Sequence, residues 1–340
     1  MVALNHAELW QTKYFHKNGL LPGWLSAGEA GVDLFFVISG FIMMYVTPRA
    51  FRGWRDQAAF LIRRFVRIYP AYWGIAIPLI LVWLVYPKLI GTSQGNRIDV
   101  ISSLLLNPSP LAPVLVVAWT LTYELYFYIV ASFLFYLAGR GRIAVAAIWF
   151  VTLVIANLIY PQTHYSPWID LLLSPLSLEF ITGMALAQIL QIDSIRVSTG
   201  VAIGLFISVL LFSFVAGVHH GRFVAELREP IRYLIYGLPA GIVVWLILKM
   251  EIQHQWRWPA FLVWLGNRSY SIYLLHAPIL ACLFLLASKW LANSGSLEIY
   301  AVTFAIILFL FIPAALFYRL IERPSHNLAK RWSRYFSQPA

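Results

Sequence analysis

Long apolar runs recur along the entire chain, and polar positions are mostly confined to the short stretches between them. A helix needs about 20 mainly apolar residues to cross the hydrocarbon core of a membrane. Nine runs approach or exceed that length, and they predict spanning helices at residues 30–47, 68–86, 113–137, 143–160, 171–190, 198–217, 233–250, 269–288 and 298–320. These runs are continuous rather than alternating, which favours helices over the strands of an outer-membrane barrel.

The apolar start of the chain, residues 1–10, suggests a tenth helix that is too short to cross. Ten helical residues cover about 15 Å, which is half of the roughly 30 Å core. The sequence therefore predicts an all-α fold: a polytopic membrane helical bundle of about ten transmembrane helices with a truncated first helix. We assign residues 1–325 to one membrane domain and 326–340 to a short basic cytoplasmic tail, and we expect no appended soluble domain.

Composition supports the membrane class. Hydrophobic residues make up 61% of the chain and charged residues only 11%, whereas an average soluble domain has about a quarter charged residues. The single cysteine, Cys282, can form neither an internal disulfide nor a Cys-rich metal site. Redox and disulfide-scaffold functions are therefore disfavoured.

The net charge of +11 comes from 25 basic and 14 acidic residues. If residue 1 lies on the cytoplasmic side, 17 of the 25 Lys and Arg fall in cytoplasmic segments and the other 8 in exterior ones. This bias follows the positive-inside rule. We therefore expect a multi-pass protein of the bacterial inner membrane with both termini cytoplasmic. Orientation and contact with anionic membrane lipids account for the charge, and no nucleic-acid partner is needed.

Ionisable side chains within membrane spans are costly, so each one is a functional candidate. They are Asp33, Glu124, Glu179 and His276, and His6 lies in the short first helix. Glu124 shares a predicted helix face with Thr120, so a carboxylate and a hydroxyl point together into the bundle. Helix packing through interhelical hydrogen bonds is an equal alternative for Glu179 and His276. Capping of a helix N-terminus is an equal alternative for Asp33.

A basic segment, FLIRRFVRIYPAYW at residues 60–73, carries Arg63, Arg64 and Arg67. On a helix, two of these side chains share one face close to the membrane surface, and guanidinium groups suit phosphates. The alternative is a positive-inside anchor that contacts lipid headgroups. From these features alone the chain is a polytopic inner-membrane protein, either a transporter or an enzyme.

Seven features in a fixed order resemble membrane acyltransferase family 3. They are His6, GVDLFFVISGFIM at 31–43, RRFVRIYPAYW at 63–73, AWTLTYELYFY at 118–128, LEFITGM at 178–184, GNRSYSIYLLHAPI at 266–279 and IERP at 321–324. Together they cover nearly the whole chain. The second and fourth of them look most similar to the branch that acetylates bacterial exopolysaccharides.

The resemblance implies a ten-helix enzyme that moves an acetyl group from cytoplasmic acetyl-CoA, without a metal, to a sugar hydroxyl. The acceptor would be an exopolysaccharide, an O-antigen or another lipid-linked or growing glycan. The resemblance assigns the essential first-helix histidine to His6 and the acid of the fourth helix to Glu124. It assigns the CoA-facing arginines to Arg63, Arg64 and Arg67. The remaining polar candidates, expected to bind substrate or to have a structural role, are Glu179, Tyr270, Ser271 and His276.

The expected chemistry starts from a neutral imidazole, the commonest general base for a hydroxyl nucleophile. A carboxylate on the other ring nitrogen of His6 would fix its tautomer, and Glu124 is the first candidate for it and Asp33 the second. Direct attack on the thioester is favoured because Cys282 lies in no activating setting. An acyl-imidazole intermediate is the alternative. A glycan or lipid transporter, which would not need acetyl-CoA, and a scaffolding protein remain as other classes.

The start of the chain departs from the family pattern. Relatives carry an Arg eleven positions before the first-helix histidine, and only five residues precede His6 here. We therefore expect that Met1 is an internal start and that the functional protein has about 10 to 30 further residues, enough to complete a span. A natural truncation is the alternative.

Overall fold

The computed structural model describes residues 2–15, 28–47, 49–90, 95–159, 166–192, 194–220, 230–291 and 295–337. These residues are mainly helical and form no β-strand. Eight helices in this part of the chain are long and apolar enough to cross a membrane, and one further apolar helix has 17 residues. The prediction of an all-α, multi-pass membrane protein is therefore confirmed.

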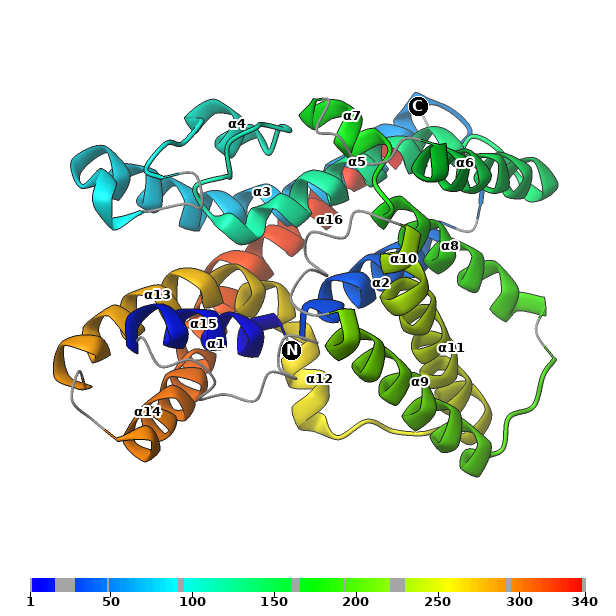
Figure 1. Ribbon diagram of the computed structural model, residues 1–340. Helices are drawn as coiled ribbons and strands as arrows, with labels where there is room; N and C mark the ends of the chain where they lie inside the picture. Colours follow the sequence, from blue (N-terminus) through cyan, green and yellow to red (C-terminus); the bar gives the residue numbers. More distant parts are fainter. Residues whose placement is uncertain are drawn as a thin grey trace. The chain divides into compact units, whose positions relative to one another are not determined.

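Figure 1 labels the α-helices, which alternate with short 3-10 and π-helical segments. In chain order they are α1 (Val2–Phe15), α2 (Ala30–Val46), α3 (Trp54–Val85), η2 (Pro87–Leu89), α4 (Val100–Leu105), η3 (Val116–Ala118), α5 (Trp119–Leu134), α6 (Gly139–Ile159), α7 (Pro167–Leu172), α8 (Leu176–Ile192), α9 (Thr199–His220), α10 (Pro230–Arg232), η5 (Tyr233–Gly237), α11 (Leu238–His254), α12 (Ala260–Asn267), α13 (Ser269–Leu291), α14 (Ser296–Phe309), α15 (Phe311–Phe317), η6 (Tyr318–Glu322) and α16 (Arg323–Ser337). Segments η5 and η6 are π-helical.

Most predicted spans agree with these helices. The span predicted at 171–190 does not, because it begins in α7 and the chain is not helical at residues 173–175. Helix α3 begins at Trp54 rather than at residue 68, so the basic segment is part of the same continuous helix. The apolar pattern marks only the hydrophobic part of α3. It therefore missed the N-terminal part of this helix, which carries the charged residues. Helix α1 extends to Phe15, beyond the expected end at residue 10. Residues 326–337 of the expected basic tail belong to α16, which packs along α3, and 338–340 lie outside the described residues.

The helices group into two compact units. The first contains Ser26–Gly53 and Tyr126–Pro259, and the second contains Val2–Leu25, Trp54–Leu125 and Ala260–Ala340. The division falls within α5.

In the first unit, α2 and α8 pack so closely that their backbones touch. A Cβ added at Gly40 would overlap the carbonyl oxygen of Phe180, and one added at Gly183 would overlap that of Val37. Small residues permit this approach in membrane bundles, where packing rather than water exclusion holds helices together. Phe127 stacks on Phe180 with ring centroids 4.7 Å apart, which extends the contact to α5.

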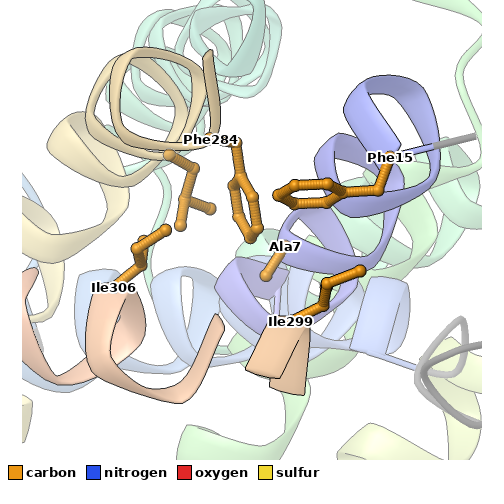
Figure 2. Close-up of a cluster of buried hydrophobic side chains, with 6 residues drawn as sticks. Ala7, Phe15, Phe284, Ile299 and Ile306 are labelled. Atoms are coloured by element: carbon orange, nitrogen blue, oxygen red, sulfur yellow. The ribbon is translucent and has the colours of Figure 1, made fainter. Parts of the chain in front are cut away.

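In the second unit, α1 packs against α13 and α14, and α16 packs along α3. Figure 2 shows the first of these interfaces, where Ala7 and Phe15 of α1 meet Phe284 of α13 and Ile299 and Ile306 of α14. The rings of Phe15 and Phe284 meet edge to face at 6.2 Å. This apolar interface fixes α1 beside α13, and so it determines where the polar side chains of α1 lie.

The contact between α2 and α8 gives a stability prediction. Replacing Gly183 with Ala should destabilise the protein by about 1 to 3 kcal/mol, because the added methyl group overpacks two touching backbones. Gly204→Ala on α9 is the matched control, since a Cβ there meets open space and Ala favours a helix by up to about 1 kcal/mol over Gly. Thermal unfolding in detergent measures both. Equal behaviour of the two variants would contradict the packing.

Candidate active site

The first turns of α13 carry a row of polar side chains that contact several other elements of the second unit. We call Tyr270, Ser271, Tyr273 and His276 the α13 polar row. The Tyr270 hydroxyl donates to the carbonyl of Ile68 in α3 at 3.0 Å, and Tyr270, Ser271 and His276 are all buried. Because an unsatisfied polar group in a membrane bundle is costly, these bonds specify which helices surround α13.

His276 contacts His6, the histidine of α1. Its Nε2 atom lies 2.9 Å from Nδ1 of His6, and the two rings stack with centroids 4.9 Å apart. His276 is 1% exposed, whereas His6 is only partly buried. The structure thus brings together two histidines separated by 270 residues. Both were candidates in the sequence analysis, but their contact was not predicted.

The hydrogen bonds of His276 determine the proton positions of the pair. Its Nδ1 lies 2.5 Å from the carbonyl oxygen of Tyr273, and a carbonyl can only accept, so this nitrogen carries the proton. In a neutral ring Nε2 is then an acceptor, and His6 must donate to it from Nδ1. A neutral His6 therefore carries its lone pair on Nε2, the nitrogen that faces away from His276.

This pairing corrects the expected hydrogen bond between a carboxylate and His6. His276, and not Glu124 or Asp33, accepts the Nδ1 proton of His6. Because Nδ1 of His276 donates to a backbone carbonyl, its Nε2 can only accept while the ring is neutral. His276 can therefore orient the His6 ring as a carboxylate would. The apolar runs of the sequence could not reveal this, because the two histidines are joined only by the packing of α1 on α13.

Glu124 of α5 lies near Tyr273 of the α13 polar row. The Tyr273 hydroxyl is 2.7 Å from Oγ1 of Thr120 and donates to the carbonyl of Val117 at 2.7 Å. Glu124 lies one turn beyond Thr120, is 4% exposed, and is within electrostatic range of Tyr273. The predicted common face of Thr120 and Glu124 is therefore present, and it is directed toward the α13 polar row.

Asp33 and Glu179 belong to the first unit, where Asp33 has a cationic partner. The guanidinium of Arg232 donates to both carboxylate oxygens of Asp33, at 2.9 and 2.8 Å. Glu179 is completely buried close to this pair, and a Cβ at Gly237 would touch its side chain. The sequence did not predict this pairing, because Arg232 and Asp33 lie 199 positions apart and no local pattern links them. A bidentate, buried ion pair supports a packing role for Asp33.

The three arginines of α3 lie in different environments. Arg64 is buried with its guanidinium 5.5 Å from the ring of Phe60, whereas Arg63 is exposed. Arg67 is half-buried and within electrostatic range of Glu322 in η6. Glu322 also accepts a 2.5 Å hydrogen bond from Ser271 of the α13 polar row. The assignment of these three arginines to the CoA side stays a prediction.

Sequence reasoning gave no role to two buried polar groups of the second unit, Glu8 and Glu322, or to the half-buried Tyr273. Helical spacing was the missed signal. Asn5, Glu8 and Gln11 follow one another at intervals of three, as do Tyr270, Tyr273 and His276. Such spacing places side chains on one helix face. Gln11 indeed donates to Thr303 of α14 at 3.2 Å.

Two further features of the described residues carry no candidate chemistry. A groove of about 550 Å³ between α8 and α11 has only apolar and hydroxyl-bearing side chains besides glycine in its lining. In the described part of the chain, no group of three or more His, Cys, Asp or Glu side chains could hold a metal ion.

Comparisons with known proteins point to one family. Residues 1–318 match the family described as "Acyltransferase domain". The chain is 31% identical to the exopolysaccharide production protein ExoZ of Rhizobium meliloti, over 77% of this chain and 80% of that protein. It is 25% identical to the peptidoglycan O-acetyltransferase OatA of Listeria monocytogenes, over 76% of this chain but only 46% of that protein. No solved structure gives a significant match.

The ion pair of Asp33 and Arg232 gives a prediction about stability. Arg232→Gln should lower the free energy of unfolding by about 3 to 5 kcal/mol, because it leaves the Asp33 carboxylate buried and uncompensated. Adding Asp33→Asn to that variant should recover most of the loss, since the buried charge is then removed. Melting of the purified protein in detergent measures both. Arg257→Gln, at an exposed arginine of the same unit, serves as the control.

Proposed function

The chain belongs to the acyltransferase family that matches residues 1–318. We propose that this O-acetyltransferase transfers an acetyl group from acetyl-CoA to a hydroxyl group of a glycan. The acceptor class we propose is an exopolysaccharide, an O-antigen or another lipid-linked glycan. The name of ExoZ supports an exopolysaccharide, and the name of OatA supports O-acetyl transfer to a polysaccharide. The observation that carries the proposal is the hydrogen-bonded pair of His6 and His276.

In the proposed reaction, Nε2 of His6 takes the proton of a sugar hydroxyl. The hydroxyl oxygen attacks the thioester carbonyl, a new C–O bond forms and the C–S bond breaks. The leaving CoA thiolate then takes the proton from His6, so base and acid are the same side chain. This route uses no thiol of the protein, in agreement with the exposed position of Cys282. An acyl-imidazole on His6 is the alternative route.

His276 acts in this scheme as a positioning residue. As His6 becomes positively charged, its Nδ1–H bond to His276 becomes charge-assisted and therefore stronger. The carbonyl of Tyr273 keeps His276 in the accepting tautomer throughout. Glu124, buried on the Tyr273 side of α13, supplies a negative charge that stabilises the developing imidazolium. The two roles explain why α13 presents polar groups to several neighbouring elements.

We further propose that the protein lies in the bacterial inner membrane with both termini in the cytoplasm. The excess of Lys and Arg in the segments assigned to the cytoplasm supports this orientation. It places Arg63, Arg64 and Arg67 on the side where acetyl-CoA is found. The donor would then enter from the cytoplasm and extend its pantetheine arm toward the histidine pair.

The proposed reaction predicts that His6→Ala reduces acetyl transfer at least about 100-fold, which is the usual minimum contribution of a positioned general base. Glu124→Gln should lose activity through kcat rather than through the KM of the donor. The measurement is transfer of labelled acetyl from acetyl-CoA to polysaccharide by the protein in lipid nanodiscs.

Cys282→Ala is the control for this experiment and should retain normal activity, because the thiol is exposed and has no part in the scheme. Normal transfer by His6→Ala would remove that residue from the mechanism. Wild-type protein that neither binds nor consumes acetyl-CoA, yet still supports the export of glycan, would overturn the proposed function in favour of a transporter.

A further inference from the structure

Arg268 is held in a fixed position immediately before α13. Its guanidinium lies 4.3 Å from the ring of Trp264 in α12 and 4.8 Å from the ring of Tyr318 in η6. Its Nη1 donates to the carbonyl of Trp264 at 3.1 Å. A guanidinium between two aromatic faces has lost most of its rotational freedom, and such placement is typical of arginines that are preorganised for a ligand.

The guanidinium of Arg268 still has an unused donor. Its Nε is buried and has no hydrogen-bond partner among the described residues, and the same holds for Nε2 of His326 in α16. Burying a polar nitrogen without a partner costs about 1 to 3 kcal/mol. Both atoms lie in the second unit, where Arg268 is within electrostatic range of Glu322 and His326 is within range of Arg67. An acceptor bound among these charges would satisfy both nitrogens.

The charges around these two nitrogens are mainly positive. Arg67 of α3 is within electrostatic range of both His326 and Glu322, and Arg268 is within range of Glu322. Glu322 already accepts a hydrogen bond from Ser271 at 2.5 Å. Two guanidiniums therefore share one carboxylate, and Lys330 adds a further positive charge within range of His326. Positive charge is thus in excess. An anion with several acceptor oxygens would satisfy these groups, and phosphate fits the fork geometry of arginine.

The geometry points to a phosphate-binding site formed by Arg268, Arg67 and His326, and we propose that it holds a phosphate of the nucleotide part of acetyl-CoA. The identity of the ligand rests on the proposed function. The position of the site is consistent with this donor. Arg268 directly precedes α13 and lies eight residues before His276, which is about 12 Å along the helix axis. The extended pantetheine arm of an acyl-CoA can cover that distance from phosphate to thioester.

The site differs from the one expected from sequence. Arg63, although part of the arginine motif, is exposed, whereas Arg268 comes from a distant segment and is ordered by aromatic side chains. The π-helical turn of η6 places Tyr318 against Arg268 while its last residue, Glu322, remains within range of both arginines. Insertion of π-helical turns is frequent at functional sites.

The test compares donors that differ only in their phosphates. In nanodiscs of zwitterionic lipid, Arg268→Gln should raise the KM for acetyl-CoA about tenfold to a hundredfold, the loss expected for charge-assisted hydrogen bonds. The KM for acetyl-pantetheine, which carries no phosphate, should stay unchanged, as should kcat for both donors. Arg319→Gln is the matched control, because Arg319 is an exposed arginine that directly follows Tyr318 in the sequence. This variant should leave both KM values unchanged.

Two outcomes would overturn the site. An equal loss with both donors would mean that Arg268 is merely structural, and unchanged KM values would mean that it binds no donor phosphate. An effect of Arg268→Gln that depends on anionic lipid, with no change in KM, would assign the site to a lipid headgroup and contradict our proposal.

A second measurement keeps the proposal testable if the variant is too unstable to assay. CoA, but not pantetheine, should raise the melting temperature of the wild type, and of Arg319→Gln equally. Equal shifts with CoA and pantetheine would exclude a phosphate site. CoA binding at this site without any acetyl transfer would instead contradict the proposed function and leave the site in place.

Discussion

The hydrogen bond between Nδ1 of His276 and the carbonyl of Tyr273 fixes the chemistry of the second unit. Because a carbonyl only accepts, this bond leaves His276 as an acceptor at Nε2 and requires His6 to donate from Nδ1. His6, the proposed general base, therefore has its lone pair on Nε2, the nitrogen that faces away from His276. A backbone carbonyl within one helix turn is a partner that cannot change its protonation state, so the arrangement is stable through a catalytic cycle.

The same helix joins the base to the proposed donor site. Ser271, five residues before His276, donates to Glu322, and Arg268 precedes α13 directly. Distances along a single helix are fixed by its rise, so α13 sets the separation between phosphate and thioester without relying on loops. The packing of α1 on α13 through Ala7 and Phe284, seen in Figure 2, then determines where His6 meets this axis.

Local patterns predicted the helices well, since spans such as 30–47 and 269–288 depend on hydrophobicity within one segment. They also singled out Asp33, Glu124, Glu179 and His276, because a charge in an apolar run is conspicuous, but they missed buried groups such as Glu8 and Glu322. They could not predict pairings such as His6 with His276 or Asp33 with Arg232, which lie 270 and 199 positions apart. They likewise missed Arg268, whose significance comes from Trp264 and Tyr318 and not from its neighbours in sequence.

The tautomer of His6 is the central claim, and nitrogen NMR of the histidine-labelled protein in lipid tests it most directly. Comparison with spectra of His6→Gln and His276→Gln assigns the two rings among the eight histidines of the chain. We predict a neutral His6 that is protonated at Nδ1 and carries its lone pair on Nε2, coupled to a His276 that is also protonated at Nδ1. A neutral His6 protonated at Nε2, or spectra in which His276→Gln leaves the His6 signals unchanged, would contradict the account.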